Sequence, residues 1–200
     1  VVAERISGAK SALVSPRDYE NDGGLRSDDV RARIPSTYEI YKRYDERCRL
    51  ANAMDFDDLL VNTYRLFKEH PEVLEQYVSR FRYVLVDEFQ DTNAVQYEIV
   101  KLLASVHGNL FAVGDDDQSI YGWRWADLHN ILDFEKDFPE CVTIKLEQNY
   151  RSTGNILDAA NQVIAHNQGR KEKALWTEHD RGERIALYHA MDERDEAAFI

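Results

Sequence analysis

The segment that most constrains the fold is residues 83–91, which read YVLVDEFQD. The first four residues form an apolar run that is typical of a β-strand covered on both faces, as in a parallel sheet flanked by helices. Asp87 and Glu88 follow directly, where that strand is expected to end. Ligands of open α/β sheets bind outside the carboxyl ends of the strands, so two carboxylates there could hold Mg²⁺ and orient a water. Two acidic residues that only solvate a turn are the alternative interpretation.

A helix and a second strand are expected to follow. Thr92 or Asn93 can cap this helix, which should end near Gly108. Its expected buried stripe consists of Val95, Ile99, Leu102, Leu103 and Val106. Residues 110–113 form the next apolar run, and two strands joined by a right-handed helical crossover are parallel. We therefore expect Asp87 and Glu88 to lie near the residues that follow this second strand.

Residues 114–127, GDDDQSIYGWRWAD, form the second informative stretch. A glycine, three carboxylates and an amide come first, and three aromatic residues around Arg124 follow. Aromatic rings beside an arginine in a polar loop suit stacking on unpaired bases. The same composition also marks protein interfaces, so a packing patch between domains is an equal alternative.

Residues 147–153, EQNYRST, lead from an expected strand at residues 143–146 into a helix that Ser152 or Thr153 can cap. Tyr150 and Arg151 lie just before the N-terminus of that helix, where a phosphate is electrostatically favoured. A tyrosine can stack on a purine, and an arginine can reach a phosphate with its fork of donors. The pattern therefore favours a phosphate or nucleotide contact at these two residues.

The remaining segments give weaker signals. Residues 1–35 have a mixed pattern with turn signals and no assigned helix. The other expected elements are, in chain order, a helix from Ser36, a helix capped by Asp55, a short helix from Pro71, a helix over residues 127–138 and a last strand over residues 185–188.

Composition narrows the class of protein. The formal net charge of −12, from 25 basic and 37 acidic residues, disfavours broad adhesion to nucleic acid or to an anionic membrane but allows a local basic groove. Cys48 and Cys141 stand alone, with no CxxC or histidine-rich spacing, so no zinc site is expected and a reducing compartment is the default. Without a bilayer-length apolar stretch or a signal-peptide pattern, a cytoplasmic protein with no membrane partner is expected. The chain starts without Met and stops within the apolar run EAAFI, so we expect a piece of a longer protein.

Three motifs together resemble a known family. Residues 87–91 (DEFQD), 114–124 (GDDDQSIYGWR) and 148–152 (QNYRS) resemble motifs II, III and IV of the superfamily 1 DNA helicases of the UvrD, PcrA and Rep type, and residues 55–60 (DFDDLL) resemble a preceding helical motif. The resemblance implies an α/β fold: a partial RecA-like parallel sheet with flanking helices, of the P-loop NTPase kind, preceded by a helical subdomain. The implied divisions are residues 1–54 (tail of an inserted helical subdomain), 55–142 (second half of the first RecA-like domain) and 143–200 (start of the second).

The resemblance also implies how ATP is handled. Asp87 and Glu88 would hold Mg²⁺, and Glu88 would be the base that orients the attacking water. Gln118 and Arg151 would contact the γ-phosphate, and Tyr150 would pack on adenine.

For DNA, the resemblance implies an aromatic contact surface. Tyr121 and Trp123 would stack on single-stranded DNA, and Trp125 lies beside them at a position where relatives commonly carry a small residue. Arg124 would link this loop to the nucleotide.

The implied function is an ATP-dependent 3′-to-5′ DNA helicase that couples ATP hydrolysis to translocation on single-stranded DNA. ATP and Mg²⁺ would be its cofactors; single strands, duplex junctions and repair or replication proteins would be its partners. The alternatives are the helicase segment of a helicase–nuclease and a truncated, non-catalytic protein that binds DNA or a partner. The 200 residues contain no GxxxxGK[ST], the loop that cradles the α- and β-phosphates. We therefore expect these residues alone neither to hydrolyse ATP nor to unwind DNA.

Overall fold

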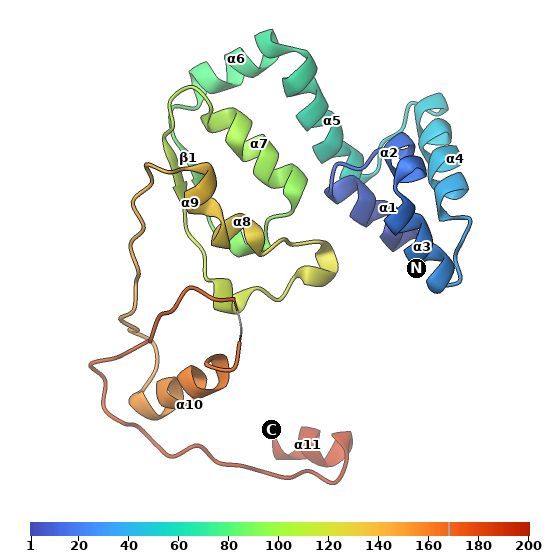
Figure 1. Ribbon diagram of the computed structural model, residues 1–200. Coiled ribbons are helices and arrows are strands. Elements are labelled where there is room, and N and C mark those ends of the chain that lie inside the picture. Colours follow the sequence, from blue (N-terminus) through green and yellow to red (C-terminus); the bar gives the residue numbers. More distant parts are fainter. Residues whose placement is uncertain (168) are drawn as a thin grey trace. The chain divides into compact units, whose positions relative to one another are not determined.

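The computed structural model describes residues 1–167 and 169–200 and divides the chain into two compact units, Val1–Pro139 and Glu140–Ile200. The first unit is mainly helical with a small parallel sheet, and the second contains two helices (Figure 1). Within the part of the chain that is described, no helix combines the length and the apolar character that a membrane span requires.

Four helices begin the first unit: α1 (Val2–Ser11), α2 (Pro16–Asn21), α3 (Gly23–Arg31) and α4 (Thr37–Leu50). The prediction of mixed structure over residues 1–35 is wrong, because the residues that signal turns there begin helices. Ser15 forms a capping box with Asp18 and is followed by Pro16 at the first helical position. Asp22 caps α3 by accepting two backbone hydrogen bonds. The helix predicted from Ser36 is confirmed as α4.

The core of these four helices centres on two tyrosines. Tyr19 and Tyr41 are buried and meet edge to face, with ring centroids 6.0 Å apart. The Tyr19 hydroxyl donates to the buried Asp29 carboxylate at 2.7 Å, and the Tyr41 hydroxyl donates to the carbonyl oxygen of Val14 at 3.0 Å. Both hydroxyls are therefore hydrogen-bonded, as buried polar groups must be for burial to stabilise the fold.

A buried lysine joins α1 to α4 and to α5 (Phe56–Glu69). Lys10 is 4% exposed, and its Nζ lies 2.7 Å from Asp55 Oδ2 and 2.7 Å from Asp58 Oδ1. Asp55 is the N-cap of α5, which confirms the predicted cap, and it also accepts a hydrogen bond from the Tyr44 hydroxyl of α4 at 2.8 Å. Burial alone would lower the pKa of Lys10, but its hydrogen bonds to the two carboxylates raise it. Burial alone would likewise raise the pKa of Asp55, but the Lys10 ammonium and other donors lower it.

The rest of the first unit contains a two-stranded parallel sheet. Strand β1 (Val84–Val86) pairs with β2 (Leu110–Ala112), and α7 (Ala94–Ala104) connects them, so the predicted parallel order is confirmed. Asn93 is the residue that caps α7, in a capping box with Gln96. The predicted helix from Pro71 is α6 (Pro71–Arg80), and α5 and α6 pack against α7 (Figure 1).

The prediction that β1 is covered on both faces is wrong. Leu85 is 72% exposed and its register partner Phe111 is 62% exposed, whereas Val84 and Val86 are half-buried. Because side chains alternate between the faces of a sheet, one face packs on the helices and the other has no cover among the described residues. Val106, predicted to lie in the buried stripe of α7, is 80% exposed because that helix ends at Ala104.

Residues 127–138 form two short helices instead of the predicted single helix: α8 (His129–Leu132) and α9 (Phe134–Asp137). Asp133 separates them and is the N-cap of α9. The Asp133 side chain makes no capping hydrogen bond there, and its carboxylate lies 2.7 Å from the Lys136 ammonium. Phe134 of α9 meets Phe89 edge to face at 5.4 Å, which packs the helix pair onto the segment after β1.

The second unit contains α10 (Gly154–Ile164) and α11 (Glu193–Phe199). Thr153 is the N-cap of α10, in agreement with the prediction. The strands predicted at residues 143–146 and 185–188 are wrong, since both segments have irregular backbone. A strand exists only with a hydrogen-bonded neighbour, and the described residues of this unit provide one isolated bridge, between Gln148 and Trp176.

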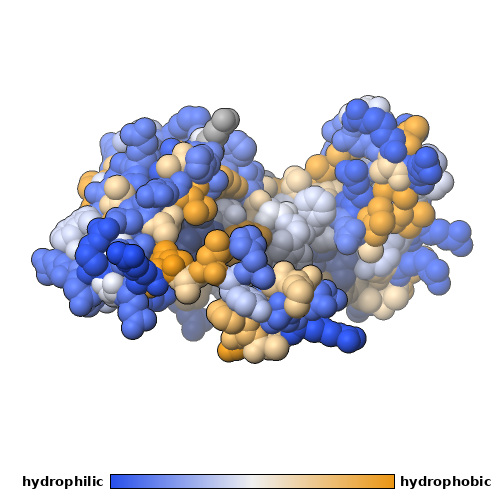
Figure 2. Space-filling model, turned by 90° about the horizontal axis from the view of Figure 1, so that it is seen from below, coloured by the Kyte–Doolittle hydropathy of each residue, from blue (hydrophilic) through white to orange (hydrophobic). Residues whose placement is uncertain are grey.

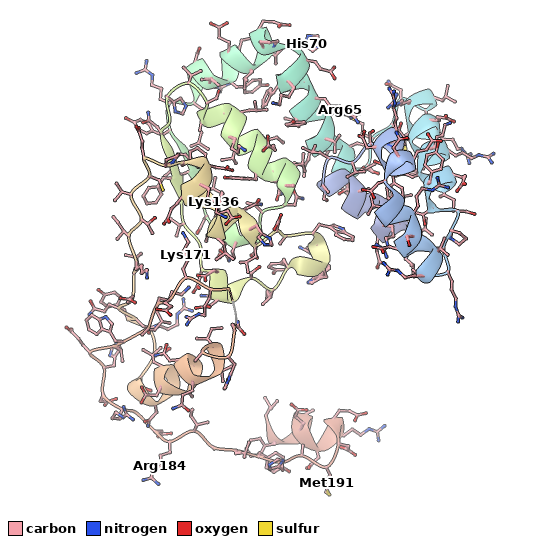
Figure 3. All side chains as sticks on the ribbon, viewed as in Figure 1. Arg65, His70, Lys136, Lys171, Arg184 and Met191 are labelled. Atoms are coloured by element: carbon pink, nitrogen blue, oxygen red, sulfur yellow. The ribbon has the colours of Figure 1, made fainter. Side chains whose placement is uncertain are left out.

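Much of the apolar surface of the second unit is exposed. Figure 2 shows hydrophobic side chains among the hydrophilic ones on the molecular surface. Figure 3 shows Arg184 and Met191 on the long segment between α10 and α11, and Met191 is 91% exposed. This segment is therefore not part of a buried core.

Candidate functional site

Strand β1 ends in a turn that exposes two carboxylates. Asp87 and Glu88 are both exposed, and Asp87 Oδ1 accepts a hydrogen bond from the Glu88 N–H at 2.9 Å. Glu88 has a left-handed backbone, with φ 49° and ψ 43°, which costs a residue other than glycine about 1–2 kcal/mol. Directly after it, the Phe89 N–H donates to the Val113 carbonyl at 2.9 Å, and the Phe89 ring is fully buried. The strained turn thus leaves the Glu88 carboxylate at the surface while the next residue anchors the chain.

A buried glutamine connects this turn to the loop after β2. Gln90 is 1% exposed; its Nε2 donates to Glu88 Oε2 at 2.8 Å, and its Oε1 accepts from the Asp115 N–H at 2.9 Å. Asp115 Oδ2 in turn accepts from Gln118 Nε2 at 2.7 Å. A chain of three hydrogen bonds therefore runs from Glu88 to Gln118. The expectation that the acidic pair lies near the residues after β2 is confirmed for Glu88, whereas the part played by Gln90 was not predicted.

The two loops approach each other closely because residue 114 is glycine. A Cβ at Gly114 would lie 2.7 Å from Gln90 Oε1, 2.8 Å from Ile131 Cδ1 and 3.2 Å from the Gln90 backbone nitrogen. Each of these distances is shorter than a normal van der Waals contact, so a larger residue at position 114 would displace the buried glutamine.

Gly114→Ala is therefore expected to lower the free energy of unfolding by about 1–3 kcal/mol, the usual cost of inserting a methyl group into a filled site. Urea denaturation followed by circular dichroism measures this difference. The matched control is Gly122→Ala in the same loop, where a Cβ would meet nothing within 4 Å, and its effect should stay within about 0.5 kcal/mol. Equal losses in both variants would refute the close approach at Gly114.

An open pocket of about 450 Å³ lies beside the acidic turn. Asp87, Glu88 and Asp91 line it together with apolar residues of β1, α5 and α7. Burial, and then the nearby Glu88 carboxylate, raise the pKa of Asp91. Asp91 Oδ1 is buried and has no hydrogen-bond partner among the described residues. Three carboxylates with one unpartnered oxygen fit a hard cation such as Mg²⁺, which prefers oxygen ligands.

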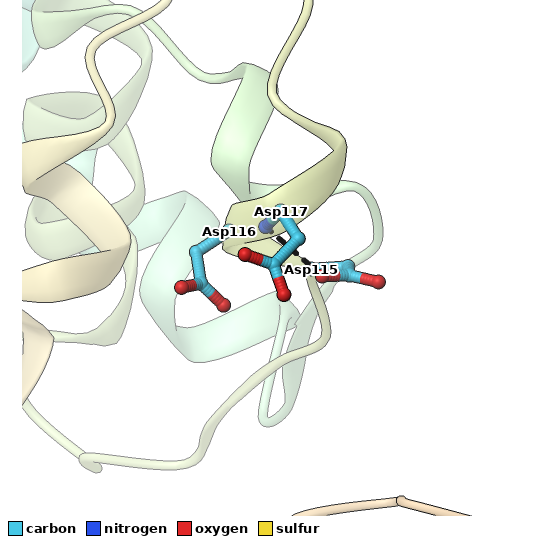
Figure 4. Close-up of side chains that lie close together, drawn as sticks. All are labelled: Asp115, Asp116 and Asp117. Carbon is cyan, nitrogen blue, oxygen red and sulfur yellow. Dashed lines mark hydrogen bonds between the residues drawn. The ribbon is translucent and has the colours of Figure 1, made fainter. Parts of the chain in front are cut away.

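Three consecutive aspartates begin the loop after β2 (Figure 4). One carboxylate oxygen of each of Asp115, Asp116 and Asp117 lies within 4.8 Å of the others. The Asp117 N–H donates to Asp115 Oδ1 at 3.0 Å, which makes Asp115 the cap of a short 3₁₀ helix, Asp116–Gln118. Asp115 therefore shapes the loop both as a helix cap and as the acceptor for Gln118.

Residues 119–126, which we call the aromatic loop, carry rings around one arginine. Arg124 Cζ lies 4.5 Å from the centroid of the Trp123 ring and 5.4 Å from that of Tyr121. Trp123 is 70% exposed and Tyr121 is 37% exposed. Trp125 differs from them, because its indole packs on Gly8 of α1. The aromatic loop thus presents three partly exposed rings and a guanidinium to solvent, since Trp125 is 37% exposed like Tyr121, and one of the three rings also packs on a helix.

Tyr150 and Arg151 lie in the second unit, just before α10. Asn149 Oδ1 accepts hydrogen bonds from the N–H groups of Arg151 and Ser152, at 2.9 and 2.7 Å, which fixes the turn into the helix. Tyr150 is 76% exposed, and its hydroxyl donates to Gln148 Oε1 at 2.8 Å. These two predicted site residues therefore belong to a different unit from Glu88 and Gln118.

Comparison with known protein families defines the class of this protein. Residues 1–139 match the UvrD/REP helicase N-terminal domain, and residues 144–200 match the UvrD-like helicase C-terminal domain. The chain therefore belongs to the UvrD/REP helicase family, and the resemblance of its three motifs to this family is confirmed.

Individual relatives carry the name ATP-dependent DNA helicase PcrA. The protein of that name from Staphylococcus epidermidis strain ATCC 35984 is 51% identical over 195 residues, and that of Staphylococcus aureus strain Mu50 is 52% identical over 195 residues. These matches cover 98% of this chain and 26% of each relative. The chain thus spans about a quarter of the length of the curated relatives that it matches.

Proposed function

We propose that this chain is part of an ATP-dependent DNA helicase that couples ATP hydrolysis to 3′-to-5′ translocation on single-stranded DNA. Its family and the names of its relatives support this function. The observation that carries the proposal is the hydrogen-bond chain from Glu88 through Gln90 and Asp115 to Gln118, because it makes the acidic turn and the start of the next loop one connected structure.

The proposal includes a finer fold and domain division. The parallel pair β1 and β2 would belong to a RecA-like sheet of the P-loop NTPase kind. Residues 1–54 would be the tail of a helical subdomain, residues 55–142 the second half of a first RecA-like domain, and residues 143–200 the start of a second.

In this proposal the acidic turn acts on ATP. Asp87 and Glu88 would hold Mg²⁺, which supplies positive charge to the phosphate oxygens. Glu88 orients the attacking water and accepts its proton, a role that suits an exposed carboxylate in an otherwise anchored turn. Gln118, tied to Asp115, contacts the γ-phosphate. The unpartnered Asp91 oxygen at the same pocket supports a cation there.

The remaining nucleotide contacts come from arginines and a tyrosine. Arg151 donates to the γ-phosphate, and Tyr150 packs its exposed ring on adenine. Their place before the N-terminus of α10 supports this assignment, because the positive end of the helix dipole favours phosphate. The N–H groups of Gly154 and Asn155 donate to the carbonyls of Asp180 and Arg181, so the phosphate contact would come from the Arg151 guanidinium. Arg124, whose guanidinium lies over the Tyr121 and Trp123 rings, would link the aromatic loop to the nucleotide.

The aromatic loop is the proposed contact with DNA. Tyr121 and Trp123 stack on unpaired bases, and Trp125 contributes the part of its ring that Gly8 leaves uncovered. Stacking on aromatic rings is tolerant of base sequence, as a motor that moves along DNA requires. The proposal includes duplex junctions and repair or replication proteins as partners, and a cytoplasmic location.

Trp123→Ala in the full-length protein is expected to weaken binding to single strands by about 1–3 kcal/mol, the contribution of one stacked base. Fluorescence anisotropy with a labelled oligothymidylate measures the dissociation constant. The matched control is Tyr83→Ala, since Tyr83 is 71% exposed and lies outside the aromatic loop. Unchanged affinity in Trp123→Ala would favour the role of the loop as a packing surface.

A further inference from the structure

Trp125 and Gly8 pack against each other, and each is a residue type that its own backbone conformation disfavours. Trp125 has φ 67° and ψ 20°, a left-handed conformation that bulky residues rarely adopt. Gly8 is buried within α1, at a helical position where alanine would favour the helix more strongly. A Cβ at Gly8 would lie 2.6 Å from Cη2, 2.6 Å from Cζ2 and 2.8 Å from Cε2 of the Trp125 indole. The contact explains the glycine, because only glycine leaves room on α1 for the ring.

Hydrogen bonds hold the chain on either side of the aromatic loop. Before it, the Asp115 N–H donates to Gln90 Oε1, and after it, the Asp127 N–H donates to the Thr92 carbonyl at 2.9 Å. Within the loop, the backbone bonds of residues 124–126 close on residues 121 and 122. These local bonds fix the conformation of the turn but do not connect it to α1. The packing of Trp125 on Gly8 makes that connection.

We propose that Trp125 is a positioning residue that fastens the aromatic loop to α1 through Gly8. The contact holds the segment that carries Trp123, so a displacement of α1 moves the loop with it. The effect on DNA binding rests on the proposed function, whereas the packing contact does not depend on it.

The contact is tested by combining Gly8→Ala and Trp125→Gly in the full-length protein and measuring amide hydrogen exchange of residues 119–126. Gly8→Ala should speed exchange of the loop by at least about threefold, because the new methyl group displaces the indole. In the Trp125→Gly background the same change should leave loop exchange unaltered and raise Tm, since alanine then only favours the helix. Gly8→Ala with no effect on the loop, or with the same effect in both backgrounds, would overturn the proposal.

A glycine-to-alanine control separates the contact from general helix effects. Gly23 is the first residue of α3, and a Cβ there would meet nothing within 4 Å. Gly23→Ala should leave exchange of the aromatic loop unchanged. Equal acceleration by Gly23→Ala would show that the loop responds to any change in the helical segment and would overturn the specific role of Gly8.

The effect of Trp125 on DNA binding is tested with a second pair of variants. Trp125→Gly should weaken oligothymidylate binding in the wild-type background and have a clearly smaller effect when combined with Trp123→Ala, because Trp125 acts mainly through the placement of Trp123. Fully additive losses would mean that Trp125 contributes only through the exposed part of its own ring and not through the placement of Trp123, which would overturn the positioning role. If Trp123→Ala alone leaves affinity unchanged, the proposed DNA contact fails, while the exchange measurements still decide the packing contact.

Discussion

Glu88→Gln in the full-length protein is expected to reduce ATP turnover by about 10²- to 10⁴-fold, the usual contribution of a general base, while ATP affinity stays nearly unchanged. The amide has almost the same shape as the carboxylate, and its carbonyl oxygen can still accept the hydrogen bond from Gln90 Nε2. It cannot accept a proton from the attacking water. Phosphate release in the presence of single-stranded DNA measures turnover, and a fluorescent ATP analogue measures binding.

The matched control for this change is Glu75→Gln on α6, an exposed residue remote in sequence from the acidic turn. It should leave both turnover and ATP binding at the wild-type level. Wild-type turnover in Glu88→Gln would rule out Glu88 as the base. Loss of ATP binding together with turnover would indicate that Glu88 mainly holds the metal and nucleotide.

Lys10→Met is expected to lower the free energy of unfolding by about 3 kcal/mol, because it leaves the carboxylates of Asp55 and Asp58 without their buried cation. Both carboxylates lie 2.7 Å from the Lys10 ammonium, and their side chains are 26% and 13% exposed. Their partial exposure and their roles in the cap of α5 place the effect at the lower end of the range for broken buried ion pairs. Urea denaturation followed by circular dichroism gives the difference.

Lys68→Met is the control for the loss of a lysine from this region, because Lys68 is exposed near the end of α5. Its effect should stay within about 0.5 kcal/mol, as for most surface substitutions. Equal losses in the two variants would show that the ion cluster does not hold α1 against α5.

The same cluster predicts how stability depends on pH. The pKa of Asp55 is lowered by folding, so its contribution is fully present above the ordinary value of 3.8 and is lost as the pH falls below it. The pKa of Lys10 is raised, so its contribution is present below the ordinary value of 10.5 and is lost as the pH rises above it. The wild-type protein should therefore lose stability at both extremes more steeply than Lys10→Met does.

Elements specified by local chemistry could be predicted from the sequence. Asp55 and Asn93 begin helices through capping boxes, and each box needs only residues three positions apart. The same chemistry misled the prediction for residues 1–35, because Ser15 and Asp22 are good residues both for turns and for helix caps. The short hydrophobic runs were harder, since residues 143–146 and 185–188 have strand composition but no strand partner in the described part of their unit.

In the candidate site, too, some contacts could be predicted from the sequence and others could not. The parallel order of β1 and β2 was enough to predict that Glu88 lies near the loop that contains Gln118. The hydrogen bonds of Gln90 could not be predicted, because its partner in the second loop is the backbone N–H of Asp115. A backbone group 25 positions away leaves no sign in the sequence. The packing of Trp125 on Gly8 was equally hidden, since 116 residues of chain separate the two, from position 8 to position 125.

The left-handed backbone at Glu88 makes the residue that is best for thermal stability different from the residue that the proposed hydrolysis of ATP requires. Glycine adopts this conformation without the steric cost that glutamate bears, so Glu88→Gly would relax the turn while removing the carboxylate. A mutant library screened only for proteins that stay folded at high temperature would be enriched in glycine at position 88. The selected variants would be stable but would lack the proposed base. Laboratory evolution of this chain should therefore hold residue 88 constant or select for phosphate release in the same round.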